Sequence, residues 1–401
     1  MKIALDDPLF EAWAQRPIFT IPEGGAEIGE IKATVALIPE GDRDRWHREW
    51  TATADRLYAQ AVECERRRAR VSARYLFLRS SSYYRNSYPL LFGHPIDSRV
   101  KSGYAREADA FDRAAQLFDP PIAPVAIPFE GIALPGYFYT GGPGVRPLLI
   151  ATDGYDETIQ TMHYGHAAAA QRRGYHVLTF DGPGQGRVLI EDGVPMRPDW
   201  EVVVRAVVDF ALTLPFIDPT RIALVGWSFG GYLAPRGASG EPRIAALIAD
   251  PGQWDLIEAM RAAFARFGIE AGIARKLPDV DEKALEPAFA AIRANPQLNW
   301  TFMQRGLMVH RVDTLIGYLR ACVDFRLSDR ISNIRCPTLV TLAEGDPVAA
   351  NAVRLYDALT CRKTLVRFTS AEGAGDHCEA GARSVYFQRA YDWLDQVFGL
   401  R

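Results

Sequence analysis

Apolar and polar positions follow two different patterns along the chain, and the change falls near residue 122. Between 45 and 78 the chain contains no Pro or Gly and is rich in Ala, Arg, Glu and Leu. Apolar residues recur there at spacings of three and four, which predicts a helix with one buried face. They are Trp46, Trp50, Leu57, Tyr58, Ala61 and Cys64. A second helix is expected over 104–118, because Pro120 and Pro121 cannot continue it.

After residue 122, short apolar runs alternate with helix-like stretches. Runs over 123–129 and 133–139 flank Glu130-Gly131 and predict an antiparallel hairpin. Six further runs are apolar on both faces, as parallel strands covered by helices require. They span 147–152, 175–180, 221–226, 244–249, 338–342 and 364–368. Helices are expected over 157–172, 199–213, 229–239, 350–360 and 382–398. The alternation predicts an α/β fold with a mostly parallel sheet flanked by helices.

One stretch between two expected strands is too long for a simple crossover. Residues 256–330 contain helix-like runs such as LIEAMRAAFARFG, so we expect a helical insertion that covers the C-terminal edge of the sheet. We therefore predict two domains. A helical N-terminal lid domain occupies 1–122, and an α/β core that carries the insertion occupies 123–401.

Composition narrows the class of protein. The chain has 401 residues, 48% of them hydrophobic and 24% charged, and a formal net charge of −3. These values are typical of a globular enzyme and give no field that attracts nucleic acid or an anionic membrane. The basic run at 65–70 lies in a helix-like stretch and is interpreted as a solvated, ion-paired helix face. We expect a small-molecule substrate, and no nucleic-acid or membrane partner.

The cysteines and the first residues bear on the compartment. No two cysteines have the close spacing of a metal or redox motif. The first residues, MKIALDDPLFEAW, carry acids and a Trp where a signal peptide needs an apolar stretch. No apolar run has the length of a membrane span. We expect a cytoplasmic protein.

The strongest chemical signal is the string Gly226-Trp227-Ser228-Phe229-Gly230, which follows an expected strand and precedes an expected helix. This is G-x-S-x-G in the strand–turn–helix context of the nucleophile in the α/β-hydrolase fold. The serine sits there on a tight turn, and the flanking glycines avoid collisions that a Cβ would cause. The pattern predicts Ser228 as a nucleophile and the backbone N–H of Phe229 as one oxyanion donor.

The fold orders its catalytic groups as nucleophile, acid and histidine. His377 alone among the histidines follows every expected core strand, which predicts it as the general base. Asp346 follows the strand 338–342 and is the favoured acid. Asp250, which ends the preceding strand, is the alternative; Asp376 is disfavoured because it adjoins His377.

The remaining motifs concern the oxyanion site and possible ligands. The loop after 147–152 offers the N–H of Gly154 or Tyr155 as the second oxyanion donor. The string DGPGQG (181–186) has neither the Lys-Ser/Thr of a P-loop nor the spacing of a dinucleotide motif, so it is interpreted as a turn. His163 and His166 are spaced like metal ligands but have no third partner, and a surface or interface role is favoured. We expect neither a metal nor a cofactor.

Several strings resemble the FrsA-like, two-domain α/β-hydrolases, a group that includes fungal polyketide-shortening hydrolases of pigment synthesis and dihydroxypseudooxynicotine hydrolase. They cover most of the chain: DGYDET (153–158), RRGYHVLTFDGPGQGR (172–187), MRPDWE (196–201), GWSFGGYLAPRGA (226–238), EPRIAALIADPGQWD (241–255) and GDHCEAG (375–381). SARYLFLRSSSYYR and PFEGIALPGYF extend the resemblance toward the N-terminus. The strings are more similar to the polyketide-pigment branch.

The resemblance implies a serine hydrolase with a helical N-terminal lid and a homodimer. It maps the family triad onto Ser228, Asp346 and His377. Nicotine-degrading members use a further acid after the strand that corresponds to IAALIAD, and Asp255 and Glu258 are candidates for it.

The resemblance also implies a reaction, namely hydrolytic (retro-Claisen) cleavage of a C–C bond next to a carbonyl in an aromatic polyketide-like or vinylogous diketone substrate. The aromatic residues of 83–92, with Trp300, Phe302 and Tyr318, either line a flat pocket or pack the lid against the core. A carboxylesterase or acyl transferase with the same triad is the alternative. A non-catalytic binding protein is disfavoured, because nucleophile, base and acid are all present.

Overall fold

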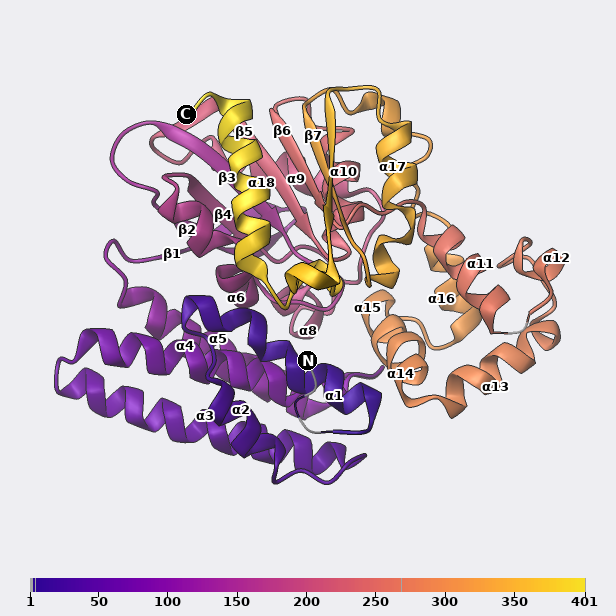
Figure 1. Cartoon of the computed structure of the whole chain (residues 1–401), viewed down its shortest axis with the longest axis horizontal. Coiled ribbons are helices and arrows are strands. Elements are labelled where there is room, and N and C mark those ends of the chain that lie inside the picture. The colour runs from indigo at the N-terminus through magenta and orange to yellow at the C-terminus, as the bar shows by residue number, and fades with distance from the viewer. Residues whose placement is uncertain (1–2, 4, 268, 401) are drawn as a thin grey trace.

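The computed structural model describes residues 3, 5–267 and 269–400. Its centre is an eight-stranded sheet in the order β1-β2-β4-β3-β5-β6-β7-β8 (Figure 1). The strands are β1 (Ala123–Phe129), β2 (Ile132–Tyr139), β3 (Arg146–Thr152), β4 (His176–Phe180), β5 (Ile217–Trp227), β6 (Ala246–Asp250), β7 (Thr338–Ala343) and β8 (Lys363–Phe368). From β4 through β3 to β8 every neighbouring pair is parallel, whereas β1 and β2 are antiparallel to their neighbours. The predicted α/β fold is confirmed.

The hairpin at the start of the sheet turns where the sequence predicted. Phe129 pairs with Ile132, and Glu130 and Gly131 between them have φ of 44° and 84°. Two successive residues of positive φ are the mark of the tight hairpin turn whose twist matches that of paired strands.

Helices cover both faces of the sheet, because side chains alternate between the faces along each strand. Leu148 and Ile150 belong to one apolar cluster with α9 (Trp200–Ala211), α10 (Gly230–Ala238) and α17 (Ala352–Ala358). Leu149 and Ala151 belong to a second cluster on the other face. That face packs against α6 (Ile159–Met162), α7 (Ala168–Arg172) and α18 (Arg383–Phe398). A short helix, α8 (Gly186–Ile190), follows β4.

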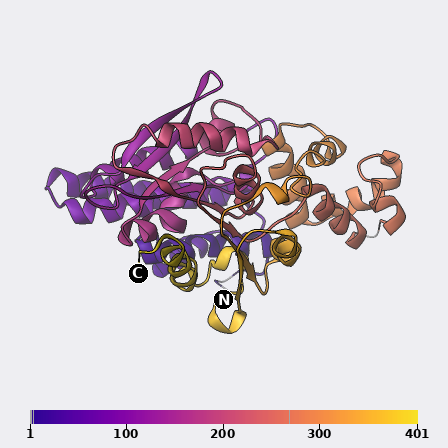
Figure 2. The same cartoon turned by 90° about the horizontal axis from the view of Figure 1, so that it is seen from above.

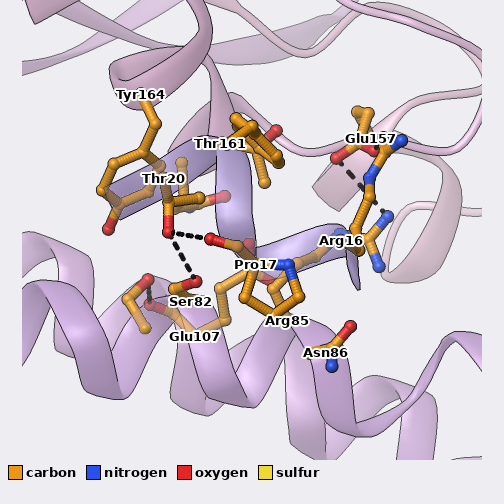
Figure 3. Close-up of a pocket in the computed structure, with 13 residues that line it drawn as sticks. Arg16, Pro17, Thr20, Ser82, Arg85, Asn86, Glu107, Glu157, Thr161 and Tyr164 are labelled. Carbon is orange, nitrogen blue, oxygen red and sulfur yellow. Dashed lines mark hydrogen bonds and ion pairs between the residues drawn. The ribbon is translucent and has the colours of Figure 1, made fainter. Parts of the chain in front are cut away.

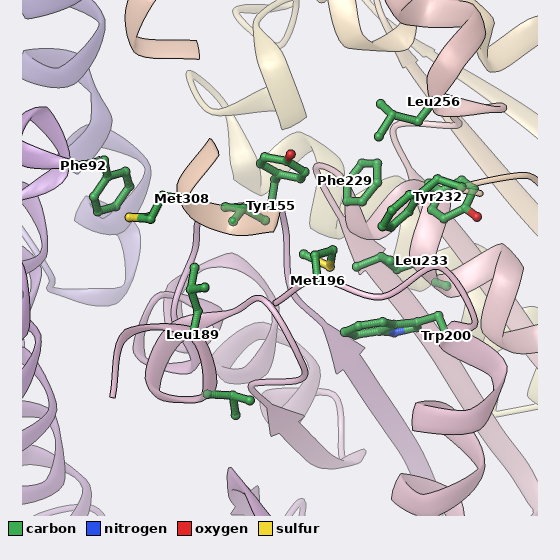
Figure 4. Packing of buried hydrophobic residues seen from close by; sticks show 14 of the residues in the cluster. Phe92, Tyr155, Leu189, Met196, Trp200, Phe229, Tyr232, Leu233, Leu256 and Met308 are labelled. Carbon is green, nitrogen blue, oxygen red and sulfur yellow. The ribbon is translucent and has the colours of Figure 1, made fainter. Parts of the chain in front are cut away.

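Before the sheet, helices form a layer along one side of the core (Figure 1). They are α1 (Pro8–Gln15), the 3₁₀ helix Arg16–Glu23, α2 (Ile28–Val35), α3 (Arg43–Arg66), α4 (Arg70–Ser87) and α5 (Ser98–Gln116). The layer is continuous with the core, since one apolar cluster runs from Phe92 in this region through Tyr155 to Trp200 (Figure 4).

The single helix expected over 45–78 is wrong, because the chain turns back between α3 and α4. Arg68 has a left-handed φ of 59°, and the N–H of Ala69 donates to the carbonyl of Cys64 at 2.8 Å. This resembles the usual helix-ending turn, but an arginine occupies the position that glycine normally takes. The sequence therefore carries no signal for the break. The second helix also begins earlier than expected, at Ser98, after the cap Asp97.

The expected helical insertion is present and stands at one end of the molecule (Figures 1 and 2). It contains α11 (Leu256–Arg266), α12 (Ala271–Ala274), α13 (Glu286–Ala294), α14 (Pro296–Leu298), a π-helical segment (Asn299–Gly306), α15 (Leu307–His310) and α16 (Leu315–Cys322). It reaches the N-terminal layer, where the Trp300 indole donates to the carbonyl of Pro89 at 2.7 Å and packs edge-on to Trp13. No helix in the described ranges has the length and apolarity to cross a membrane.

Candidate active site

The turn between β5 and α10 presents Ser228 at the C-terminal end of the sheet. Ser228 has a positive φ of 57°, a strained conformation for a residue with a side chain. Its N–H donates to the carbonyl of Asp250 at 2.7 Å, which fixes the turn to the neighbouring strand. A Cβ on Gly226 would lie 1.8 Å from the carbonyl oxygen of Gly230, and a Cβ on Gly230 would lie 2.8 Å from that of Thr152. Both glycines are therefore required by the close approach of strand and helix.

His377 and Asp346 lie in line with the serine. Ser228 Oγ is 2.8 Å from His377 Nε2, and His377 Nδ1 is 2.8 Å from Asp346 Oδ2. The Asp346 side chain is fully buried, and its other oxygen accepts the N–H of Val348 at 2.8 Å. If Nδ1–H donates to this carboxylate, Nε2 is left unprotonated and can take the serine proton.

Asp250, the alternative acid, makes different contacts. Its Oδ2 lies 2.9 Å from Arg383 Nη1, and its Oδ1 accepts the Thr341 hydroxyl at 2.9 Å. The same guanidinium donates to the carbonyl of Cys378 at 2.9 Å, and both charged side chains are fully buried. Asp250 and Arg383 thus tie the histidine loop to the end of β6, and Asp250 does not contact His377.

The loop after β3 approaches the nucleophile closely, since a Cβ on Gly154 would lie 2.9 Å from Ser228 Cβ. The Gly154 N–H donates to Asp153 Oδ1 at 2.6 Å. The N–H groups of Tyr155 and Phe229 have no protein acceptor among the described residues. Of the two predicted loop donors, Tyr155 is therefore the one available to an oxyanion.

Gln185, in the DGPGQG string, sets the direction of these peptide groups. Its side-chain Nε2 donates to the carbonyls of Asp153 and Gly154 at 2.8 and 2.9 Å, while its Oε1 accepts the N–H of Gly182. Carbonyl and N–H point in opposite directions across a trans peptide. By holding the Gly154 carbonyl, Gln185 directs the Tyr155 N–H to the other side of the loop.

A cavity of about 160 Å³ adjoins Ser228 and His377, and three parts of the chain line it. The N-terminal region contributes Leu9, Ala12, Trp13 and Arg16. The insertion contributes Gln297, Trp300, Thr301 and Arg305, largely from its π-helical segment. Such segments are frequent at functional sites. A neighbouring hollow shares Ala12, Arg16 and His377 with this cavity.

Sequence reasoning did not identify Trp13, Arg16, Arg305 or Asp156 as site residues. Only Asp156 had a usable signal, because it follows the oxyanion loop directly. Trp13 and Arg16 lie more than two hundred positions before Ser228 and belong to no motif. Of the aromatic residues named from the sequence, Trp300 lines the cavity, whereas Tyr83 and Phe302 are buried in packing contacts.

The two candidates for a further acid are engaged away from the serine. Asp255 accepts the N–H groups of Leu327 and Ser328 at 2.7 and 2.9 Å, and the Ser328 hydroxyl as well. It therefore fastens the end of the insertion. Glu258 pairs with Arg354 at a partly exposed position. Neither carboxylate lines the cavity, which instead contains Asp156.

The expected surface or interface role of His163 and His166 is wrong. Both are buried, at 2% and 0% exposure, because His163 packs among Phe111, Phe118 and Tyr139, and His166 packs against Tyr386 of α18. Burial lowers the pKa of His163 to about 3, so this imidazole is neutral. His166 Nδ1 lies 3.0 Å from the Tyr391 hydroxyl. The described residues contain no group of three ligands that could hold a metal.

The parallel sheet, the serine turn and the aligned histidine and aspartate define the class of α/β hydrolases. The alpha/beta hydrolase family matches residues 155–385, and the family described as "Esterase FrsA-like" matches residues 34–253. The chain therefore belongs to the alpha/beta hydrolase family and, within it, to the FrsA-like proteins. The resemblance inferred from the sequence is confirmed.

Several hydrolases are similar to this protein over nearly the whole chain. Hydrolase LUC6 of Fusarium sp is 34% identical, with 96% of each chain covered. The 20-hydroxy-prefusarin hydrolase FUS2 of Gibberella moniliformis is 33% identical over the same share of both chains. The crystal structure of 2,6-dihydroxy-pseudo-oxynicotine hydrolase matches with a TM-score of 0.73 and 25% identity, covering 94% of this chain and 95% of that one. The protein is a hydrolase of this family.

Proposed function

We propose that the protein is a serine hydrolase that cleaves a C–C bond next to a carbonyl, in an aromatic polyketide-like or vinylogous diketone substrate. Ser228 is the nucleophile, His377 the base and Asp346 the acid that orients it. The observation that carries this proposal is the unbroken contact of the three side chains, 2.8 Å at each step, at the wall of a cavity.

The reaction follows from this geometry. Ser228 Oγ attacks the carbonyl carbon while His377 Nε2 takes its proton, and the N–H groups of Tyr155 and Phe229 face the resulting oxyanion. When the oxyanion collapses, the C–C bond breaks and its electron pair remains on the departing carbon, which takes the proton from His377. Water, deprotonated by His377, then hydrolyses the acyl-serine and releases a carboxylic acid.

Two relatives support hydrolysis of a small organic substrate. FUS2 is named as a hydrolase of 20-hydroxy-prefusarin, and the structural neighbour as a hydrolase of 2,6-dihydroxy-pseudo-oxynicotine. Trp13 and Trp300 line the cavity and offer aromatic ring surface to such a substrate. The matching family is described as an esterase, which favours ester hydrolysis as the second candidate, with the same triad.

We further propose that residues 1–122 act as a lid over the core of 123–401, within a homodimer in the cytoplasm. Support for the lid comes from the four cavity-lining residues that precede Pro17. A closed cavity excludes water, which matters more for a carbanion leaving group than for an alkoxide, because protonation must come from His377 alone.

The test is product analysis with a panel of aromatic β-diketones and aryl esters, using the wild type and Ser228→Ala. We expect ketone cleavage to a carboxylic acid and a methyl or methylene ketone. Loss of the nucleophile should reduce turnover by about 10⁴–10⁶. A Ser228→Ala enzyme that keeps more than a tenth of the activity would sink the assignment, and cleavage of esters alone would select the second candidate.

A further inference from the structure

Two guanidinium groups enter the cavity beside Ser228 and take no part in the triad or the oxyanion site. Arg16 comes from the N-terminal region and Arg305 from the π-helical segment of the insertion. Their side chains keep 27% and 26% of their exposure in an otherwise covered region. Both are therefore accessible to a molecule in the cavity.

The carboxylates around these arginines do not balance their charge. Asp156 Oδ1 lies 3.2 Å from Arg305 Nη1, and Glu157 pairs with Arg16 (Figure 3). A third arginine, the buried Arg85, shares both acids, at 3.7 Å from Asp156 and 3.5 Å from Glu157. Three guanidinium groups thus share two carboxylates.

The other titratable groups near these arginines do not fully neutralise the excess of positive charge. Burial raises the pKa of Asp153 well above its usual value, which favours the neutral form of that carboxyl. Burial also lowers the pKa of Arg16, and although Asp156 opposes this shift, Arg85 adds to it. The pKa of Asp156 is lowered despite its burial, because Arg305, Arg85 and Arg16 together outweigh desolvation. Glu107 also acts on Arg85, but burial raises the pKa of Glu107 to about 7, so it offsets the positive charge only in part and the site stays cationic.

Arg305 also carries a donor with no protein partner. Its Nε is buried and makes no hydrogen bond among the described residues. The guanidinium lies over the rings of Trp300 and Tyr155, with its carbon 4.8 and 5.2 Å from their centroids. A buried, unpaired donor on a stacked cation is costly unless a ligand supplies an acceptor.

We propose that Arg16 and Arg305 bind a conjugated, negatively charged oxygen of the substrate, either the enolate of a 1,3-dicarbonyl or a carboxylate on a planar ring system. This rests on the proposed function and deepens it by naming the acidic class of substrate. The chemistry fits C–C cleavage. The electron pair of the broken bond passes to the departing carbon and is delocalised onto the oxygen of the adjacent carbonyl, where a guanidinium stabilises it. A neutral ester has no corresponding charge.

Binding is the first test, because it does not depend on turnover. In the Ser228→Ala background, where the diketone is not cleaved, calorimetry would compare naphthoate with naphthamide, and an enolisable naphthyl 1,3-diketone with its C-dimethylated form, which cannot enolise. We expect Arg16→Met and Arg305→Met each to weaken binding of an acidic probe about 10–100-fold, and of the neutral probes less than threefold. Loss of naphthoate binding identifies a carboxylate, and loss confined to the diketone identifies an enolate. Arg45→Met, on an exposed helix face, is the matched control.

Turnover is the second test. In both variants the ratio of kcat/KM for the enolisable diketone to kcat/KM for a neutral aryl ester should fall at least tenfold, because the ester carries no charge for the guanidinium to bind. Equal losses for acidic and neutral probes would overturn the proposal and indicate a structural role. A wild type that binds the acidic probes through these arginines but cleaves only esters would overturn C–C cleavage and leave the binding site standing.

Discussion

Asp346 and Asp250 both follow parallel strands at the same edge of the sheet, yet their partners give them different chemistry. Among the described residues, His377 is the only side chain that Asp346 contacts by a hydrogen bond or ion pair. Asp250 instead faces the buried Arg383. The first arrangement orients an imidazole, and the second compensates a cation that water cannot reach.

Asp346→Asn should therefore lower kcat by about 10⁴, because the amide favours the wrong imidazole tautomer, and leave the melting temperature nearly unchanged. Asp250→Asn should instead destabilise the fold by up to about 3–5 kcal/mol, since Arg383 loses its closer carboxylate and keeps only Glu379, at 3.3 Å. Chemical denaturation and kcat, measured on both variants, separate the two roles. The reverse ranking would assign the acid to the earlier strand.

Gln185 acts on the oxyanion site through its hold on the loop carbonyls, so it is a positioning residue. Gln185→Met keeps the length of the side chain and removes both donors. We expect kcat to fall roughly 10–100-fold with KM changed less than threefold, because the Tyr155 N–H no longer points at the developing charge. Affinity for a trifluoromethyl ketone, which forms the tetrahedral oxyanion, should fall in parallel. If kcat and affinity for the acid product fell together instead, the loop would be a substrate contact.

Single residues could be predicted from the sequence where their chemistry requires particular neighbours close by in the chain. Ser228 needs glycines on either side, and the fold's order of groups selects His377 and admits both Asp250 and Asp346 as the acid. Gln185 was read as part of a turn, because its role depends on two carbonyls more than thirty positions away. Arg16 and Arg305 had no local signal at all, since the cavity that joins them exists only after the chain has folded.

Among the elements, α5 carries a buried carboxyl that links the N-terminal layer to the core. Glu107 accepts the hydroxyls of Tyr88, after α4, and of Thr158, after β3. Burial raises the pKa of Glu107 from 4.5 to about 7, although Arg85 and the two hydroxyls favour its charged form. Asp181 is shifted in the same direction, also to about 7. Folding therefore retains protons on these groups that the unfolded chain releases.

Proton linkage makes the free energy of unfolding depend on pH through Glu107. The stabilising contribution of protonated Glu107 is complete below about pH 4.5 and is lost as the pH rises through about 7. Glu107→Gln removes this titration, so its stability relative to the wild type should improve between pH 5 and 8, by up to about 3 kcal/mol. Urea denaturation across this range measures the difference. Glu191→Gln, at an exposed position, should show no such trend, and a flat difference for Glu107→Gln would contradict the assignment.

Helices and strands could be predicted where the apolar pattern is long and the sequence marks the ends of the element. All eight strands appear within a few residues of their expected places, because buried parallel strands read as unbroken apolar runs. The break between α3 and α4 was not predictable, since Arg68 adopts a conformation that sequence assigns to glycine. The start of α4 is held by residues far away in the sequence, because Arg70 donates to the carbonyls of Gln116, Leu117 and Phe118 at the end of α5.

On the scale of the whole molecule, the cavity exists only because three parts of the chain meet. Trp13 from the N-terminal region packs edge-on against Trp300 of the insertion, with ring centroids 5.3 Å apart. The core supplies Ser228 and His377 beneath them. One apolar cluster continues through all three parts, so each of them would expose apolar side chains to water if it stood alone.

The proposed lid role of the N-terminal region predicts that this region cannot be removed without loss of solubility and activity. A core fragment starting at Ala123 should be poorly soluble, because removal of the N-terminal region uncovers the apolar surface under α4 and α5. It should also lose activity toward bulky aromatic ketones, whose binding wall contains Trp13. Because such a fragment can fail to fold, Trp13→Leu in the full chain provides the second arm. There we expect KM for a bulky ketone to rise at least tenfold, while a small aryl ester is affected less than threefold. A soluble core fragment that cleaved bulky ketones at the full-length rate would show that the region is not a lid, as would an unchanged KM in Trp13→Leu.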